Sequence, residues 1–479
     1  MNSRKYFLLT VVGVLFFYGC KVMEPQPLPA VTPMPAQFDT AIKEQDTFAL
    51  EFSTFFPDPY LVELIDSALK NNNDLNIALQ RISRAEARLT ARKGAMLPSV
   101  DAVVSGGGER YGDYTMNGVG NFDTNLSPNI KEDQRIPTAP TTDIFVGLRS
   151  SWEIDLWGKL RHREKAAAAG LMATREARQL IVTNLVANLS HHYYELLALD
   201  AELEIVKKNI ALQEEELEIV KAQQAGGRAT KLAVQQFAAQ VLNTKAIRYH
   251  LLQSRAEVET EISLLLGKYP GHVARDTSLP GPARSVTIRA GLPASLLLRR
   301  PDIRQAEHVM EAAKENVKAA RAAFLPSLVI TPYLGLNAFT PGLLFNGGSA
   351  AYGLVGGLTG PLFHQRALRS QYTIANADNR EAVYAYQQRL LEAYTEVVTR
   401  LSAVQNLRHS YNTKLQEVQQ LSDAVVTARD LYLSGYANYL EVIMAQKSVL
   451  EAELELVNQK RDIFLALVQL YRSLGGGWK

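Results

Sequence analysis

The sequence lacks the cysteine pairs and the motifs that form disulfides, common metal sites and nucleotide sites. Cys20 is the only cysteine among 479 residues, so a disulfide within the chain is excluded and a metal site would need histidine and carboxylate ligands. His191 and His192 are adjacent and lack the His-Glu-x-x-His spacing of zinc proteases. The glycine runs 106–108 and 475–477 are not followed by the Lys-Ser/Thr of a phosphate-binding loop. We therefore predict no enzyme activity, no metal and no nucleotide-driven step.

The chain also lacks an excess of one charge and a long apolar segment. Its formal net charge of +2 favours neither nucleic acid nor acidic partners. The apolar run 7–17 follows Arg4 and Lys5 and is too short for a comfortable membrane span. This pattern predicts a signal peptide over residues 1–19.

The signal peptide ends at Tyr18-Gly19-Cys20, which resembles the lipobox of bacterial lipoproteins, with Phe17 where that motif usually has leucine. The resemblance implies that Cys20 is the mature N-terminus and carries a covalently attached diacylglycerol. We predict no cofactor besides this lipid. Two or three acyl chains would make the anchoring stable. The alternative is an ordinary secretory signal. Residues 20–56 begin with dense prolines, so we predict an extended segment that leads from the lipid along the surface.

An internal duplication is the most informative pattern in the chain. Six residues of the first half have the same residue type 228 positions later: Asp74, Ala78, Ala85, Leu97, Pro98 and Ser99. In both halves a helix starts near the aspartate and ends before the Leu-Pro-Ser motif, because the residue before proline is pushed out of helical geometry. Pro301 suits the first turn of the second helix, since its missing N–H has no partner there. Such a repeat fixes the architecture.

Period-two alternation after each Leu-Pro-Ser motif predicts two hairpins, hence four β-strands. One face of the 144–154 strand is apolar and the other is small or charged: Ile144, Val146, Leu148, Trp152 and Ile154 against Gly147, Arg149, Ser151 and Glu153. Both a membrane β-barrel wall and a soluble sheet with one wet face show this pattern. We expect 106–142 to be a long exposed loop, and the aromatics Tyr111, Tyr114, Phe145 and Trp152 to lie at the membrane interface. Four strands cannot close a barrel, so several chains share one or the sheet is soluble.

Proline and glycine are nearly absent from 158–224, which predicts a helix of roughly 100 Å. Apolar residues recur at heptad positions there, with Gln213 at one of them: Leu203, Val206, Ile210, Leu217 and Val220. The second half has heptad residues at Val418, Leu421, Val425, Ala428 and Tyr432. Val418, Val425 and Ala428 lie 208 positions after Ile210, Leu217 and Val220, so the register is duplicated. Each long helix is followed by a sharp turn, at 226–230 and 434–438, and by a return helix, at 231–266 and 439–474. The sequence thus predicts two long coiled-coil helical hairpins.

The predicted organisation along the chain has six parts. After the signal peptide 1–19 and the lipid-anchored segment 20–56, the first structural repeat covers 57–266 and the second covers 294–474. The linker 267–293, rich in proline and glycine, separates them, and 475–479 is a C-terminal tail.

Two sequence blocks identify the family that this organisation resembles. They are Leu298-Arg299-Arg300-Pro301-Asp302-Ile303 with Ala306-Glu307, and Trp152-Glu153-Ile154-Asp155-Leu156-Trp157-Gly158-Lys159-Leu160. Together with the Leu-Pro-Ser motifs and the glycine-containing turns, they resemble the TolC-like outer-membrane efflux factors, in the OprM/NodT-like lipoprotein branch that works with RND-type pumps. The resemblance covers essentially the whole mature chain. Arg299, Arg300, Pro301 and Asp302 form its signature.

The resemblance implies a mainly α fold with membrane β-structure. Three chains would each give four strands to a trimeric 12-stranded β-barrel, above a periplasmic α-helical tunnel. The homotrimer would sit in the outer membrane, lipid-anchored and extending into the periplasm, as the passive exit duct for drugs and amphiphiles. Its partners would be a periplasmic adaptor, an inner-membrane RND-type pump and outer-membrane lipid. The turns would contact the adaptor through Gly227, Arg228, Thr230, Gly435, Tyr436 and Asn438.

In this family acidic residues ring the periplasmic aperture of the tunnel. Glu441 matches one such position, whereas Met444 lies where the family often has aspartate. The like charges of three chains around a narrow pore would repel one another, so protonation, cations or adaptor contact would bias opening. Alternatively, Leu440 and Met444 make an apolar constriction, or Glu441 is a solvated helix carboxylate.

Other functions remain alternatives. The same fold serves type I protein secretion or metal-ion export. A more distant alternative is a periplasmic adaptor or a structural coiled-coil lipoprotein, which would lack the duplicated strand pairs. A periplasmic enzyme is disfavoured by the missing catalytic set.

Overall fold

The computed structural model of the chain describes residues 27–35, 38, 58–276, 279, 294–361 and 365–476. The predicted signal peptide, Cys20 and most of the predicted linker lie outside these residues. The chain divides into two compact units, and both units contain segments from both sequence copies. The first unit comprises Met1–Pro29, Arg84–Leu171 and Val309–Val383, and the second comprises Ala30–Ser83, Met172–His308 and Tyr384–Lys479.

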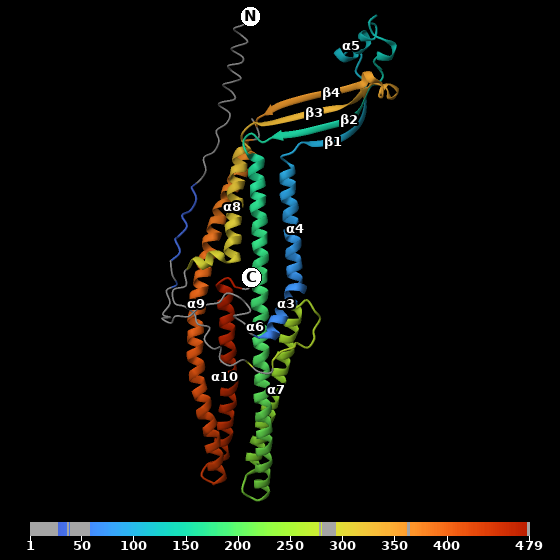
Figure 1. Cartoon of the computed structure of the whole chain (residues 1–479). Helices are drawn as coiled ribbons and strands as arrows, with labels where there is room; N and C mark the ends of the chain where they lie inside the picture. The colour runs from blue at the N-terminus through green and yellow to red at the C-terminus, as the bar shows by residue number, and fades with distance from the viewer. Residues whose placement is uncertain are drawn as a thin grey trace. The chain divides into compact units, whose positions relative to one another are not determined.

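The first unit contains a four-stranded antiparallel sheet in the order β1-β2-β3-β4 (Figure 1). Its strands are β1 (Ser99–Glu109), β2 (Thr141–Ile154), β3 (Ser327–Ala338) and β4 (Ala350–Thr359). Short 3-10 turns, η3 (Pro341–Leu343) and η4 (Gly347–Ser349), lie between β3 and β4. The strand count and the pairing within each hairpin agree with the prediction.

The register of the sheet puts apolar side chains on one face, as the alternation predicts. Leu148 of β2 pairs with Ala102 of β1 and Leu334 of β3, and Leu334 pairs with Tyr352 of β4. Leu148, Leu334 and Tyr352 are exposed in the chain. Polar side chains occupy the opposite face, where Asp101 pairs with Arg149.

The structure corrects two expectations for this region. The stretch 106–142 is not all loop, because Gly106–Gly108 continue β1 and pair with Ile144, Asp143 and Thr142, so the ladder extends through residues of low strand propensity. Between the strands lie a helix, α5 (Met116–Thr124), and a 3-10 turn, η1 (Glu132–Gln134). Phe145 is not an interfacial aromatic on the apolar face. It is 5% exposed on the face of Arg149, whose guanidinium lies 4.7 Å from the centre of its ring.

The helices follow the predicted duplication. The first copy has α3 (Pro59–Asn71), α4 (Asn73–Gly94), α6 (Lys159–Ala225) and α7 (Lys231–Leu265). The second has η2 (Ala294–Arg299), α8 (Pro301–Ala322), α9 (Gln365–Leu433) and α10 (Tyr439–Ser473). With 67 and 69 residues, α6 and α9 are each about 100 Å long. Among the described residues, no helix has the length and the apolar composition needed to cross a membrane.

The core of the second unit lies between its helices. The heptad residues Val206, Ile210 and Val220 are buried, as the coiled-coil pattern predicts. A second cluster around Leu297, Ile303 and Val397 also includes Phe38, which stacks on Tyr394 of α9. The hydroxyl of Thr32 accepts a hydrogen bond from Gln387 of α9. Thr32 and Phe38 of the N-terminal segment therefore both contact α9.

Candidate functional site at the hairpin turns

The two hairpin turns have the same backbone geometry. The α6–α7 turn contains Gly227 at φ +71°, and the α9–α10 turn contains Gly435 at φ +81°, a conformation that glycine adopts without strain. The next residue donates its N–H to the carbonyl five residues back: Arg228 to Gln223 at 2.8 Å, and Tyr436 to Leu431 at 2.9 Å. Both bonds close the end of a long helix in the way typical of a glycine cap. Every one of these residues has its counterpart 208 positions on.

Each return helix begins with a side-chain cap. Thr230 Oγ1 accepts a hydrogen bond from the Ala233 N–H at 3.1 Å, and Asn438 Oδ1 accepts one from the Leu440 N–H at 2.9 Å. Glu441 completes a capping box, because its carboxylate accepts a hydrogen bond from the Asn438 N–H at 3.2 Å. Glu441 is therefore more than a solvated carboxylate, and the Asn-x-x-Glu spacing in the sequence was a signal for this role.

The predicted aperture residues share an exposed surface at the start of α10. Leu440, Glu441 and Met444 are all exposed, and Tyr436 of the turn is exposed as well. Val442 points the other way and is buried in a small cluster with Val220, Ala233 and Phe237. The structure thus brings the three predicted aperture residues together on the outside of one chain. Their assignment to an aperture stays a prediction, as does the assignment of the turn residues to adaptor contact.

Polar contacts hold the two hairpins together just behind the turns. The hydroxyl of Tyr432 on α9 donates a hydrogen bond to Gln223 Oε1 on α6 at 2.7 Å. Burial raises the pKa of Tyr432, so it remains a neutral donor. Farther from the turns, the Gln446 amide of α10 contacts the Glu216 carboxylate of α6. These pairs cannot be predicted from the sequence, because Gln223, Glu216 and Gln446 belong to no motif.

A buried polar pair interrupts the apolar heptads of the first hairpin. Gln213, which is 2% exposed, accepts a hydrogen bond from the Thr244 hydroxyl of α7 at 2.8 Å. Its Nε2 has no hydrogen-bond partner among the described residues. The corresponding residues of the second hairpin, 208 positions on, are Leu421 and Ala452. The polar pair is therefore specific to the first copy.

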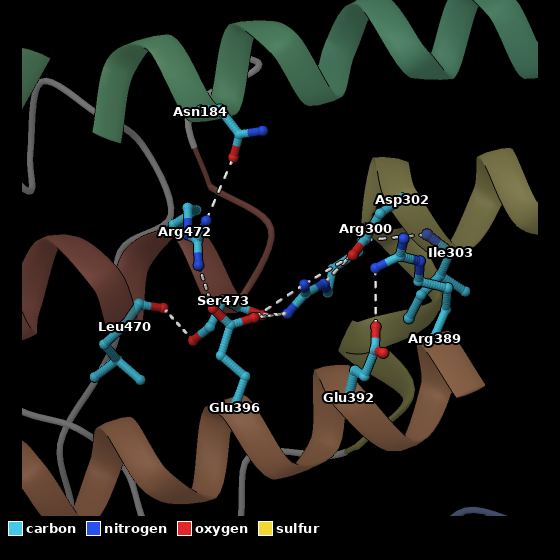
Figure 2. Close-up of polar contacts among 10 residues, drawn as sticks. All are labelled: Asn184, Arg300, Asp302, Ile303, Arg389, Glu392, Glu396, Leu470, Arg472 and Ser473. Carbon is cyan, nitrogen blue, oxygen red and sulfur yellow. Dashed lines mark hydrogen bonds and ion pairs between the residues drawn. The ribbon is translucent and has the colours of Figure 1, made fainter. Parts of the chain in front are cut away.

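The signature arginine Arg300 lies in an ion-pair network at the other end of the return helix (Figure 2). Its guanidinium donates to both carboxylate oxygens of Asp302 at 3.0 and 2.8 Å, to Glu396 Oε2 of α9 at 3.1 Å, and to the Ser473 carbonyl of α10 at 2.6 Å. Arg472 also contacts Glu396. Burial lowers the pKa of Arg300, but the Asp302 and Glu396 carboxylates outweigh that effect and raise it. Arg299, the other signature arginine, is exposed.

The first copy makes the same connection with a different side chain. Asn72 lies 228 positions before Arg300, and its Nδ2 donates to the Leu265 carbonyl at 2.9 Å, just as Arg300 donates to Ser473. Gly267 and Gly475 follow these carbonyls at φ +66° and +83°. In both copies a hydrogen bond thus connects the start of one helix, α4 or α8, to the end of the return helix, α7 or α10. The Arg-Arg-Pro-Asp block therefore connects α8 to α10 through the side chain of Arg300, which is 9% exposed.

The second signature block connects strands to helices in the first unit. The Trp152 indole N–H donates to the Met96 carbonyl at 3.0 Å, and the Trp157 indole N–H donates to the Pro326 carbonyl at 2.7 Å. Asp155 caps α6 by accepting from the N–H groups of Leu160 and Arg161 at 3.0 and 2.9 Å. Burial raises the pKa of Asp155, and these hydrogen bonds lower it by more. The block therefore binds both Leu-Pro-Ser regions to the junction between β2 and α6.

The described residues include no group of three or more histidine, cysteine or acidic side chains that could hold a metal ion. His191 and His192 both approach Glu195, with ring nitrogens 3.9 and 3.4 Å from its carboxylate, within one stretch of α6. Cys20, the predicted lipid site, lies outside the described residues.

Comparison with known proteins agrees with this duplicated geometry. The family model of the outer membrane efflux protein matches residues 64–268 and 292–476. The two matches begin 228 positions apart and end 208 positions apart, the offsets that relate Asn72 to Arg300 and Leu265 to Ser473.

Relatives and solved structures cover nearly the whole chain. The solvent efflux pump outer membrane protein SrpC of Pseudomonas putida is 31% identical over 99% of both chains. The cation efflux system protein CusC of Escherichia coli is 29% identical over 98% of this chain and 99% of its own. A crystal structure of CusC superimposes with a TM-score of 0.82 at 27% identity, covering 96% of this chain and 100% of that one. The outer-membrane channel OprN gives a TM-score of 0.83 at 25% identity, with the same coverage.

Proposed function

The chain belongs to the outer membrane efflux protein family, and from this we propose that three copies form the exit duct of a tripartite efflux system. Family membership makes it an outer-membrane efflux channel and not an enzyme. It also confirms the resemblance inferred from the signature blocks. The trimer, its adaptor and pump, its cargo and its lipid belong to the proposal.

The four-stranded sheet is the observation that supports a trimer. Its edge strands β1 and β4 have no second partner strand among the described residues, and one of its faces is apolar and exposed. Open edges are not tolerated in lipid, because each unpaired N–H and C=O group would be left without a partner. Pairing β1 of one copy with β4 of the next removes both edges, and three copies give twelve strands.

The native mass of the purified protein in detergent tests this assembly. We expect three copies per particle and a band that resists SDS until it is heated. A monomer or dimer that remains folded would contradict the shared barrel.

The hairpin turns are the surface that we assign to the adaptor. They present Arg228 and Tyr436 beside glycines that leave the backbone accessible, since a Cβ placed at Gly227 or Gly435 meets no atom within 4 Å. Beside them lie the aperture residues Leu440, Glu441 and Met444. An adaptor from an RND-type pump that binds both turns would thus act directly on the helices that carry the aperture.

We assign small organic molecules as the cargo. SrpC is named for a solvent pump, a second Pseudomonas putida relative is named for toluene, and CusC is named for cations. The two named for organic solvents are 31% identical to this chain over 99% of their length. Metal-ion export is the alternative outcome, and it would appear as lost tolerance to metal cations in a deletion strain that retains normal dye export.

We also propose that Cys20 is lipidated. A relative from Salmonella typhimurium is named a probable outer membrane lipoprotein. Growth with an alkyne-bearing fatty acid should label the wild-type chain, and Cys20→Ser should abolish the label. Equal labelling of both chains would contradict lipidation at this cysteine.

A further inference from the structure

The helix α5 exposes a set of large apolar side chains in the loop between β1 and β2. Met116 is 91% exposed and Phe122 is 63% exposed, and Val119 between them is exposed too. We call these three residues the α5 apolar face. Leu126 and Tyr114 extend it beyond the helix ends. Exposed apolar side chains gathered on one side of a helix are typical of an interaction site.

The loop holds α5 in a defined orientation. The side chain of Asn125 bonds both backbone groups of Ile136, at 2.9 and 2.8 Å. Asn121 Nδ2 donates to the Thr141 hydroxyl at 3.2 Å. At about 100° per residue, Asn121 lies on the side of the helix opposite to the centre of the α5 apolar face. The α5 apolar face therefore points away from the end of β2.

The contact with Thr141 shows which side of the sheet α5 lies toward. Side chains alternate along β2, whose pairing with β1 is regular from Ser151 to Thr141. Thr141 therefore shares a face with Phe145 and Arg149, opposite to the apolar face of Val146 and Leu148. In the proposed barrel the face of Arg149 is the inner one, so the hydrogen bond between Asn121 and Thr141 would hold α5 on the lumen side of the rim.

Composition and size argue for other copies of this helix as the partner and against lipid. Helices that lie on membrane surfaces carry lysine and arginine, whereas α5 has neither and has Asp123 as its one charge. Twelve strands about 4.8 Å apart and tilted by about 45° enclose a barrel of roughly 13 Å radius. One helix is about 10–12 Å across, so three helices bound to the inner rim would reach one another.

We propose that the α5 helices of the three copies meet through the α5 apolar face, across the mouth of the barrel at the end remote from the long helices. The proposal rests on the shared barrel described above. Burying these side chains against one another removes them from water, which is the force that would hold the contact.

Oxidative cross-linking of the full-length protein in intact cells tests this contact. Phe122→Cys lies on the α5 apolar face, and its matched control Thr124→Cys lies two residues away on the opposite side of the same exposed helix. We expect Phe122→Cys to form a cross-linked dimer at least about tenfold faster, because the meeting helices raise the effective thiol concentration. The parent chain, which keeps Cys20, gives the background rate.

Equal rates for the two variants in particles that still contain three copies would overturn the α5 contact and leave the barrel intact. Quenching of a dye on Phe122→Cys by nitroxide-labelled phospholipid, without a faster cross-link, would also overturn it, in favour of a lipid surface. Particles without three copies would instead show that the proposed barrel is wrong.

Discussion

Arg300 is a buried cation whose partners come from three helices. Asp302 lies in α8, Glu396 in α9 and the Ser473 carbonyl in α10. The sequence marked Arg300 through its motif, and the neighbouring Asp302 was visible with it. Glu396 is 96 positions away and belongs to no motif, so only the packing of α9 against α10 reveals it.

Arg300→Ala should lower the free energy of unfolding by about 1–3 kcal/mol, because it leaves the part-buried carboxylates of Asp302 and Glu396 without this cation. Arg299→Ala, at the exposed neighbouring position, should change it by less than about 0.5 kcal/mol. Urea denaturation in detergent, followed by circular dichroism, measures both. Similar losses in the two variants would mean that the network contributes little to stability.

Glu315 of α8 gives the first unit a stability that depends on pH. Its carboxylate lies 2.6 Å from His162 Nδ1 and 2.5 Å from Lys318 Nζ. Burial raises the pKa of Glu315, but these two contacts outweigh it and lower the pKa below the ordinary 4.5. The resulting stability is present above pH 4.5 and is lost as the pH falls through the folded-state pKa.

Wild-type protein should therefore lose more stability than Glu315→Gln when the pH falls from 7 to 3. The variant has no carboxylate to protonate, so its curve should lack this component. Parallel curves, from thermal unfolding at each pH, would contradict the assignment.

Glu441 combines a cap with a charge near the predicted aperture, and two substitutions separate them. Glutamine can still accept the Asn438 N–H in a capping box, so Glu441→Gln should remove the charge at little cost in stability. Glu441→Ala should lose the charge and also about 0.3–1.5 kcal/mol of capping-box stability. If charge repulsion biases the aperture, both variants will change the single-channel open probability in planar bilayers. An effect on open probability that is seen only with Glu441→Ala would show that Glu441 acts as a helix cap and that its charge does not affect opening.

At the scale of elements, local signals fixed most helix boundaries. Pro301, Thr230 and Asn438 mark helix starts, and Gly227 and Gly435 mark turns, because each acts through its own backbone. Strand β1 was the exception. Gly106–Gly108 have low strand propensity, and their strand geometry comes from pairing with β2, which lies more than thirty residues away.

The pair of Gln213 and Thr244 makes a prediction about the first hairpin. Thr244→Ala alone should destabilise it by about 1–3 kcal/mol, because Gln213 stays buried and loses its partner. Adding Gln213→Leu recreates the Leu421–Ala452 arrangement of the second hairpin and should restore or exceed wild-type stability. Urea denaturation of the single and double variants decides this. A double variant less stable than wild type would show that the polar pair is stabilising.

The bond between Tyr432 and Gln223 makes a prediction about the turns. Tyr432→Phe removes one hydrogen bond between the hairpins, worth about 0.5–1.5 kcal/mol, and should raise the open probability roughly two- to tenfold. Tyr436→Phe, at the exposed tyrosine of the same turn, is the control and should leave it unchanged. Equal open probabilities for wild type and Tyr432→Phe would exclude this bond as a restraint on opening.

At the scale of the whole molecule, the internal duplication was the feature that best predicted the architecture. Offsets of 228 and 208 were readable from Leu-Pro-Ser motifs and heptads, and they reappear in the contacts of Asn72 and Arg300. The helix α5 and the contacts behind the turns were not readable. They depend on which side chains meet after folding, and Gln223 or Asn121 looks in the sequence like any other surface amide.

The central claim is that this chain exports small molecules through a shared duct. The most direct measurement is retention of a fluorescent amphipathic dye in cells that lack this gene and every other duct of the family, compared with the same cells carrying the gene. We predict higher retention in the deletion strain, returned to the parental level by the wild-type gene. Unchanged retention in a strain whose pump and adaptor are present would contradict the claim.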